Sequence, residues 1–127
     1  MSLRIHHLAV VVTDLERAER FYAGVLGLEV RRRWADAAGA PRSIWLALGG
    51  DAFLAVELGK AAAARRPEGA PGWHCVALAI PATERGAWRA RLQAAGHPVE
   101  RESEYTLYVR DPEGNLVALS HHPEPAG

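Results

Sequence analysis

The sequence predicts an α+β fold built from one β-α-β-β-β unit that occurs twice in the chain. Two observations support the repeat. The runs that open the two halves are similar, His7-Leu-Ala-Val-Val-Val and His74-Cys-Val-Ala-Leu-Ala-Ile, and both are rich in apolar and β-branched residues typical of strands. The hairpins that close the two halves also correspond, at residues 48–58 and 109–119. One such unit is too small to bury its sheet alone, so two units are expected to pack against each other, within one chain or between chains.

Length and composition are those of one globular domain. The 127 residues carry 15 basic and 15 acidic side chains, are 49% hydrophobic and include one cysteine, Cys75. The zero net charge provides no broad field for binding nucleic acid or an anionic membrane, and a single cysteine excludes an internal disulfide. The chain starts without an apolar signal core, and no run approaches about 18 apolar residues, so a cytoplasmic protein is expected.

We expect a single domain over residues 1–127, with module one at about 4–59, a connector at 60–72 and module two at about 73–122. The connector holds two prolines, two glycines and no large apolar residue. Expected strands lie at 5–12, 28–34, 43–48 and 52–58 in module one, and at 73–80, 99–102, 105–109 and 116–120 in module two.

One helix is expected between the first two strands of each module. The segment Thr13-Asp-Leu-Glu16 has capping-box spacing, so the first helix should start near Asp14 and end at Gly27. The second should span residues 83–95 and stop at Gly96.

Four segments resemble the vicinal oxygen chelate superfamily, which includes glyoxalase I, extradiol dioxygenases, fosfomycin-resistance proteins and bleomycin-binding proteins. They are His7-Leu-Ala-Val-Val-Val-Thr-Asp14-Leu15 with the following Phe21-Tyr22 and Leu26-Gly27-Leu28, Ala55-Val56-Glu57-Leu58, Trp73-His74-Cys-Val-Ala-Leu-Ala, and Asp111-Pro-Glu-Gly-Asn115-Leu116. The resemblance covers almost the whole chain. It implies that the modules form a half-open barrel around a metal ion, and that the protein is a homodimer, as relatives of this length are.

The resemblance further implies that His7, Glu57 and His74 bind the metal, since they match the family's ligand positions residue by residue. Two imidazoles and one carboxylate suit a divalent ion: Fe, Mn, Ni, Co or Zn. Ala118 stands where most metal-binding members carry a glutamate, which leaves a further position for water or substrate. Ser120 or His122 are candidate replacement donors because they share the strand face of Ala118.

Strand alternation places His7 and Ala9 on one face of the first strand and Ala55 and Glu57 on one face of the fourth. A buried, unpaired glutamate in such apolar surroundings is costly, and coordination to a cation removes that cost. The alternative is a pocket without metal, in which Glu57 pairs with an arginine such as Arg42 or Arg110.

Several residues are candidates for contact with a substrate. Trp34 and Trp45 flank the loop at 35–42, and Arg31 or Arg33 could hold an anionic group. The candidates for the pocket wall are Trp34, Trp45, Ala118 and Ser120. His6 is expected to point away from His7, and His121-His122 to form a solvated tail.

Two functions are consistent with these residues. The first is a metal-dependent lyase, isomerase or dioxygenase that chelates a small substrate through two neighbouring oxygens, with Ala118 arguing against glutathione-dependent glyoxalase I activity. The second is a small-molecule binding or sequestration protein of the bleomycin-resistance type, which needs no metal. In both cases the partners are a small molecule and a second copy of the chain.

Overall fold

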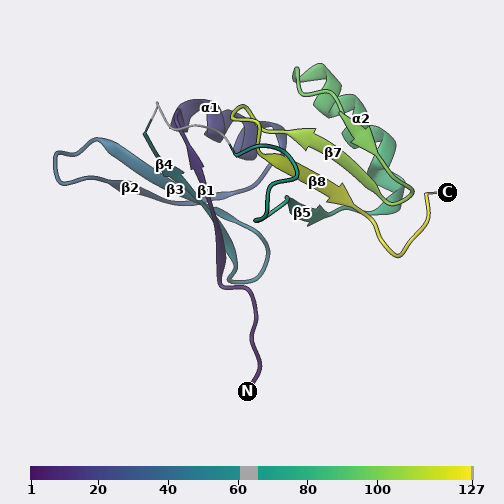
Figure 1. The fold of residues 1–127 in the computed structure, drawn as a ribbon, viewed down its shortest axis with the longest axis horizontal. Coiled ribbons are helices and arrows are strands. Elements are labelled where there is room, and N and C mark those ends of the chain that lie inside the picture. Colours follow the sequence, from purple (N-terminus) through teal and green to yellow (C-terminus); the bar gives the residue numbers. More distant parts are fainter. Residues whose placement is uncertain (61–65, 127) are drawn as a thin grey trace. The chain divides into compact units, whose positions relative to one another are not determined.

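The structure is a computed structural model that describes residues 1–60 and 66–126. It contains two compact units, Met1–Arg65 and Arg66–Gly127, and each has the predicted β-α-β-β-β order (Figure 1). The α+β fold class with paired modules is therefore confirmed. The predicted connector at 60–72 falls partly on residues 61–65, which lie outside the described residues. The association of the units into a half-open barrel stays a prediction.

The first unit is a four-stranded mixed sheet in the order β1-β4-β3-β2. Strand β1 (His7–Val12) runs parallel to β4 (Phe53–Leu58), and the remaining neighbours are antiparallel. The other two strands are β2 (Val30–Ala35) and β3 (Pro41–Ala47). The strand at 28–34 thus starts two residues later than predicted.

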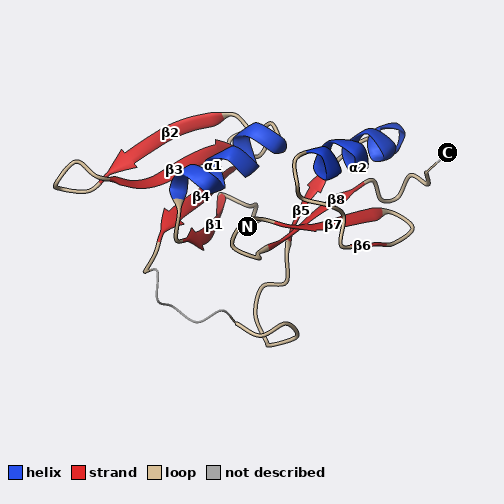
Figure 2. Ribbon diagram, turned by 90° about the horizontal axis from the view of Figure 1, so that it is seen from above, coloured by secondary structure: helices blue, strands red, loops and turns tan. Residues whose placement is uncertain are grey.

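The connection from β1 to β2 is helical, as the capping pattern predicts. Helix α1 (Leu15–Glu19) continues into the π-helix η1 (Arg20–Val25) and lies over β3 and β4 (Figure 2). Asp14 is the N-cap, and its carboxylate accepts a hydrogen bond from the Arg17 N–H at 3.0 Å. Gly27 follows with φ of +78°, a conformation that glycine adopts without steric cost, so the chain leaves the helix there.

The second unit repeats the plan in the order β5-β8-β7-β6. Its strands are β5 (Val76–Ala79), β6 (Arg101–Glu102), β7 (Thr106–Arg110) and β8 (Leu116–Ser120). The 3-10 turn η2 (Ala82–Glu84) leads into helix α2 (Arg85–Ala94), which lies along one face of this sheet (Figure 2). Two predicted strands, 73–80 and 99–102, are shorter in the structure.

The Asp-Pro-Glu-Gly motif forms the predicted turn between β7 and β8. Asp111 is only 4% exposed, and its carboxylate accepts hydrogen bonds from the backbone N–H groups of Glu113 and Asn115. Gly114 has φ of +87° and donates to the Asp111 carbonyl. The motif therefore has a structural role in this unit, because it satisfies the backbone of a tight hairpin.

In each unit the sheet face toward the helix forms the core. In the first unit the buried set is Val12, Phe21, Tyr22, Ile44, Leu46, Leu54 and Val56. In the second unit it is Leu92, Leu107, Val109, Val117 and Leu119. The opposite face of the first sheet carries His7, Glu57 and the aromatic side chains of Trp34, Trp45 and Phe53. The opposite face of the second sheet carries Ala118 and Ser120. None of the helices in the described ranges is long and apolar enough to cross a membrane.

The N-cap of α1 provides a direct test of the local fold. We expect Asp14→Ala to lower the free energy of unfolding by about 1 kcal/mol, because the first turn loses the acceptor for the Arg17 N–H. Asp14→Asn should retain most of the stability, since asparagine caps helices nearly as well. Urea unfolding followed by circular dichroism measures both. Equal losses in the two variants would show that Asp14 acts by something other than capping.

Candidate functional site

The parallel pairing of β1 with β4 places two predicted ligands on one sheet face. His7 is opposite Phe53 and Val11 is opposite Glu57, so the two rows carry side chains of the same orientation. Four residues separate the rows, which corresponds to about 13 Å along the strands. Ala9 and Ala55 form the row midway between them. The row between His7 and Glu57 therefore carries only methyl groups on this face.

The His7 imidazole is exposed and rests on an aromatic side chain. Its ring is parallel to that of Phe53, with 4.9 Å between centroids and 8° between planes. Its Nδ1 lies 2.9 Å from Nδ1 of His6, so one of the two nitrogens donates and the other accepts. The expectation that His6 points away from His7 is wrong. His6 precedes β1, so strand alternation does not govern it, and its ring also contacts Phe53.

Glu57 is half-buried, and no hydrogen bond or ion pair of its carboxylate occurs among residues 1–60 and 66–126. The alternative partner Arg110 is bound elsewhere, to Glu100 and Glu68 within the second unit. Across the sheet Glu57 faces Ser43 on β3. The carboxylate is therefore a free acceptor on the face that also carries His7.

Two buried hydrogen-bond donors lie in the same row as Glu57. Ser43 is 2% exposed, and neither its Oγ nor the Nε1 of Trp34 has a hydrogen-bond partner. Trp34 is directly opposite Ser43, and Ser43 is directly opposite Glu57, so one row crosses β2, β3 and β4. Sequence reasoning identified Trp34 and Glu57 but missed Ser43. The signal was present, because Ser43 stands two residues before Trp45 and so shares its face.

Aromatic rings form a continuous series over the same face. We call Trp34, Trp45, Phe53 and His7 the aromatic row. The centroid distances are 5.2 Å from Trp34 to Trp45 and 4.2 Å from Trp45 to Phe53, and His7 completes the series on β1. The predicted pocket residues Trp34 and Trp45 are thus in contact with each other. Such a surface favours planar, unsaturated ligands.

The arginines of β2 are distributed differently from the sequence expectation. A register irregularity between Val30 and Arg32 changes the alternation of the strand. Arg33 consequently lies on the helix side, where it forms a bidentate pair with Glu19, and Arg31 donates to the Gly50 carbonyl at 2.8 Å. Arg32, which the sequence did not suggest as a substrate contact, lies on the same sheet face as the aromatic row, directly opposite Trp45.

Arg32 covers the outer end of the aromatic row. Its guanidinium carbon lies 4.0 Å from the Trp34 ring centroid, a cation–π distance, and the residue is exposed. It therefore brings a positive charge to the same end of the face as the unpartnered Trp34 Nε1.

In the second unit His74 is exposed and lies outside a strand. Strand β5 begins at Val76, so the predicted strand from Trp73 is wrong at its start, and alternation does not orient His74 or Cys75. The pairing also differs from that of the first unit. Ala118 is opposite Ala77, three residues after His74, whereas Glu57 is opposite Val11, four residues after His7. Relative to the histidine of its own unit, Ala118 is therefore paired one residue earlier than Glu57 is.

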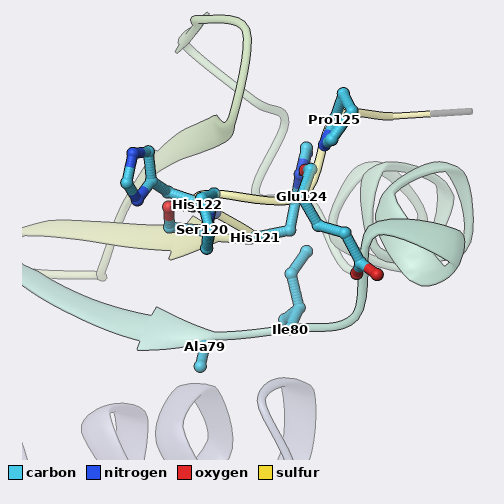
Figure 3. Close-up of a pocket in the computed structure, with 8 residues that line it drawn as sticks. Ala79, Ile80, Ser120, His121, His122, Glu124 and Pro125 are labelled. Atoms are coloured by element: carbon cyan, nitrogen blue, oxygen red, sulfur yellow. Dashed lines mark hydrogen bonds between the residues drawn. The ribbon is translucent and has the colours of Figure 1, made fainter.

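Ala118 and Ser120 lie on the open face of the second sheet. Ala118 is 1% exposed and is flanked by Ala77 and Tyr108. The Ser120 hydroxyl accepts a hydrogen bond from Thr106 at 3.0 Å. Ser120 also borders a cavity of about 550 Å³ at the end of β8, where Figure 3 shows it next to His122.

The expectation of a solvated His121 is wrong. His121 is 4% exposed, and its Nε2 lies 2.9 Å from an Arg85 nitrogen. Arginine only donates, so Nε2 accepts and Nδ1 carries the proton toward the Glu124 carbonyl. The C-terminal segment is thereby tied to α2. His121 is a structural residue of this unit.

Within either unit, the described residues include no group of three His, Cys, Asp or Glu side chains placed to hold a metal ion. The predicted set draws on both units, with His7 and Glu57 from the first and His74 from the second.

Comparison with known proteins identifies the family. Residues 4–119 match the model of the Glyoxalase/Bleomycin resistance protein/Dioxygenase superfamily. The chain belongs to this superfamily, and the resemblance inferred from its motifs is confirmed. A search of curated proteins found no match to the sequence.

Solved structures share the fold. A lactoylglutathione lyase from Agrobacterium tumefaciens is 25% identical, with a TM-score of 0.72 and 96% of each chain covered. A glyoxalase family protein from Enterococcus faecalis is 23% identical, with a TM-score of 0.76 and coverage of 93% of this chain and 97% of the other. The fosfomycin resistance protein FosX from Mesorhizobium loti is 19% identical, with a TM-score of 0.74 and coverage of 94% and 92%.

The pairing of Arg33 with Glu19 on the helix side predicts a pH-dependent effect. The hydrogen bond from Arg33 lowers the pKa of Glu19 below its ordinary value of 4.5. The carboxylate therefore stabilises the fold above that value, and the stabilisation is lost as the pH falls through the lowered pKa.

We expect Glu19→Gln to reduce the unfolding free energy at pH 7 by at most about 1 kcal/mol, because the pair is largely exposed. The difference from the unsubstituted protein should shrink at low pH. Thermal unfolding between pH 7 and pH 3 measures it. A difference that does not change with pH would contradict the assignment of the pair.

Proposed function

We propose that this protein is a divalent-metal-dependent enzyme of the glyoxalase and dioxygenase type, a lyase, isomerase or dioxygenase that acts on a small oxygenated substrate. His7, Glu57 and His74 would hold the ion, which is Fe, Mn, Ni, Co or Zn. The observation that carries the proposal is the unpartnered Glu57 carboxylate, which shares a sheet face with His7 across the small residues Ala9 and Ala55. Imidazole and carboxylate donors are the types that these metals accept.

The metal, when bound, would supply Lewis-acid polarisation of substrate oxygens. The chain's own residues have separate roles. The aromatic row, in which Trp45, Phe53 and His7 stack on one another, provides apolar ring edges that orient the organic part of the substrate. Glu57 is the candidate acceptor for a substrate proton as well as the candidate ligand, because it has no other partner in the described chain.

Ala118 distinguishes this chain from a glyoxalase I with four protein donors. Its methyl group cannot donate to a metal, and the hydroxyl of the nearby Ser120 already accepts from Thr106. The missing donor leaves room for water or substrate at the ion. The similarity to a lactoylglutathione lyase supports the reaction class, and the absent donor argues against glutathione-dependent glyoxalase I activity.

A metal-free binding protein of the bleomycin-resistance type is the second candidate. The observation that favours it is the engagement of His7, whose ring is stacked on Phe53 while its Nδ1 faces His6. In this case the aromatic row alone would hold a planar ligand. The two candidates differ in whether ligand binding needs a divalent ion.

We further propose that the protein is a homodimer in the cytoplasm, the dimer because relatives of this length pair their modules in that way. Light scattering coupled to size exclusion gives the mass in solution. A mass near twice 13.8 kDa supports the dimer, and a mass of one chain contradicts it.

Metal titration tests the proposed ligand set. After removal of metal by a chelator, the protein should bind one Co²⁺ per chain. Glu57→Gln and His74→Ala should each weaken binding at least about tenfold, equivalent to about 1.4 kcal/mol. Glu29→Gln, an exposed glutamate before β2, is the matched control and should leave the affinity unchanged. Equal Co²⁺ affinity in all four proteins would rule out the ligand set.

Restoring the missing donor tests the role of Ala118. Because a fourth carboxylate adds an oxygen ligand, we expect Ala118→Glu to raise Co²⁺ affinity at least about tenfold. Circular dichroism establishes whether this buried substitution preserves the fold, and Ala118→Gln controls for size. Unchanged or weaker affinity in a folded Ala118→Glu variant would show that this position of β8 does not face the ion.

A further inference from the structure

We infer that Trp34 and Ser43 form a donor pair that binds the carboxylate of a planar aromatic acid. This inference names the class of substrate for the proposed function. It rests on the proposed function, because it assumes that the substrate binds on the sheet face that carries His7 and Glu57. Both donors lie in the row that crosses β2, β3 and β4, in which Ser43 stands between Trp34 and Glu57.

The observation that carries the inference is the absence of partners for both donors. Ser43 is 2% exposed, and the Trp34 Nε1 is buried as well. Leaving a buried polar group unpaired costs about 1–3 kcal/mol, so folded proteins rarely retain one without a use. Here two such groups are direct neighbours across β2 and β3. Neighbours of this kind have Cβ atoms about 5 Å apart, close enough to serve one ligand group.

The chemistry of the two atoms selects the ligand group. The indole N–H only donates, and the serine hydroxyl can donate too. Two neighbouring donors suit the two oxygens of a carboxylate. Arg32 adds a positive charge at the same end, since its guanidinium lies over the Trp34 ring at 4.0 Å. Because Arg32 is exposed, its side chain can turn from the ring toward an entering anion.

The surroundings select the rest of the ligand. Trp34 and Trp45 are in edge contact, and Trp45 stacks on Phe53 at 4.2 Å and 23°. Because stacked rings present their edges, a planar ring joined to the carboxylate can make edge-to-face contacts with them, whereas a saturated ring of the same size cannot. Glu57, directly opposite Ser43, repels an anion, so the carboxylate binds on the Trp34 side of the Ser43 hydroxyl and any neutral or metal-bound oxygen lies toward Glu57.

Benzoate is the simplest probe, and the indole N–H signals of ¹⁵N-labelled protein are the readout. The Trp34→Phe variant assigns the Trp34 signal by its loss. We expect millimolar benzoate to shift the Trp34 signal in metal-free and in Co²⁺-loaded protein, and cyclohexanecarboxylate to bind several-fold more weakly. Ser43→Ala should weaken benzoate binding about tenfold, the effect of one charge-assisted hydrogen bond. Trp88→Phe, on α2, is the matched control and should bind normally.

A stability measurement distinguishes a ligand site from a structural pair. Since the Ser43 hydroxyl has no partner, Ser43→Ala should leave the melting temperature of the ligand-free protein unchanged or raise it. A lower melting temperature would show that the hydroxyl is already satisfied, by water or protein, and would overturn the inference.

The outcomes also separate this inference from the proposed function. If benzoate fails to shift Trp34, or if Ser43→Ala and Trp34→Phe bind it as the unsubstituted protein does, the donor pair is wrong even if Co²⁺ binds to Glu57. If benzoate binds as expected but Glu57→Gln leaves Co²⁺ affinity unchanged, the donor pair stands and the metal-dependent function fails.

Discussion

The parallel register between β1 and β4 determines what the first unit can do. This pairing joins the first and last strands of the unit, so that residues about 50 positions apart in the chain are direct neighbours across the two strands. His7, Ala9 and Glu57 come to one face only in this register. A slip of one residue would move Glu57 to the helix side and expose half of the core. The burial of Val12, Leu54 and Val56 on the helix side therefore fixes the position of the polar residues opposite them.

The two faces of each sheet have different roles: one forms the apolar core and the other carries the candidate site residues. The helix side is an apolar layer and carries neither His7 nor Glu57. The other side of the first sheet carries the free Glu57 carboxylate, the aromatic row, and the Ser43 hydroxyl and Trp34 indole, which are the buried side-chain groups without a hydrogen-bond partner among residues 1–60 and 66–126. This division allows the open face to vary between relatives without loss of the fold, in agreement with the many activities found on this scaffold.

Hydrophobic periodicity was sufficient to predict the repeated unit, the order of its elements and the face of β1 that is buried. It also identified the cap at Asp14 and the exit at Gly27, because these depend on local stereochemistry. The resemblance to the superfamily rested on short motifs, and the match over residues 4–119 confirms it.

Other features depend on information that a linear pattern does not contain. The irregularity in β2 reverses the alternation after Val30, so Arg32 rather than Arg33 belongs to the aromatic face. Similarly, β5 starts after His74, which removes the basis for orienting that residue by alternation. His121 was assigned to a solvated tail because its partner Arg85 lies 36 residues away. Ser43 acquires its significance only from its neighbours across the sheet.

Binding of a divalent ion to the face that carries His7 and Glu57 can be tested by anomalous diffraction. For a crystal of the Co²⁺-loaded protein, measured at the cobalt absorption edge, we expect one strong peak per chain, about 2.0–2.2 Å from a nitrogen of His7 and a carboxylate oxygen of Glu57. A peak elsewhere, or no peak within bonding distance of Glu57, would contradict it.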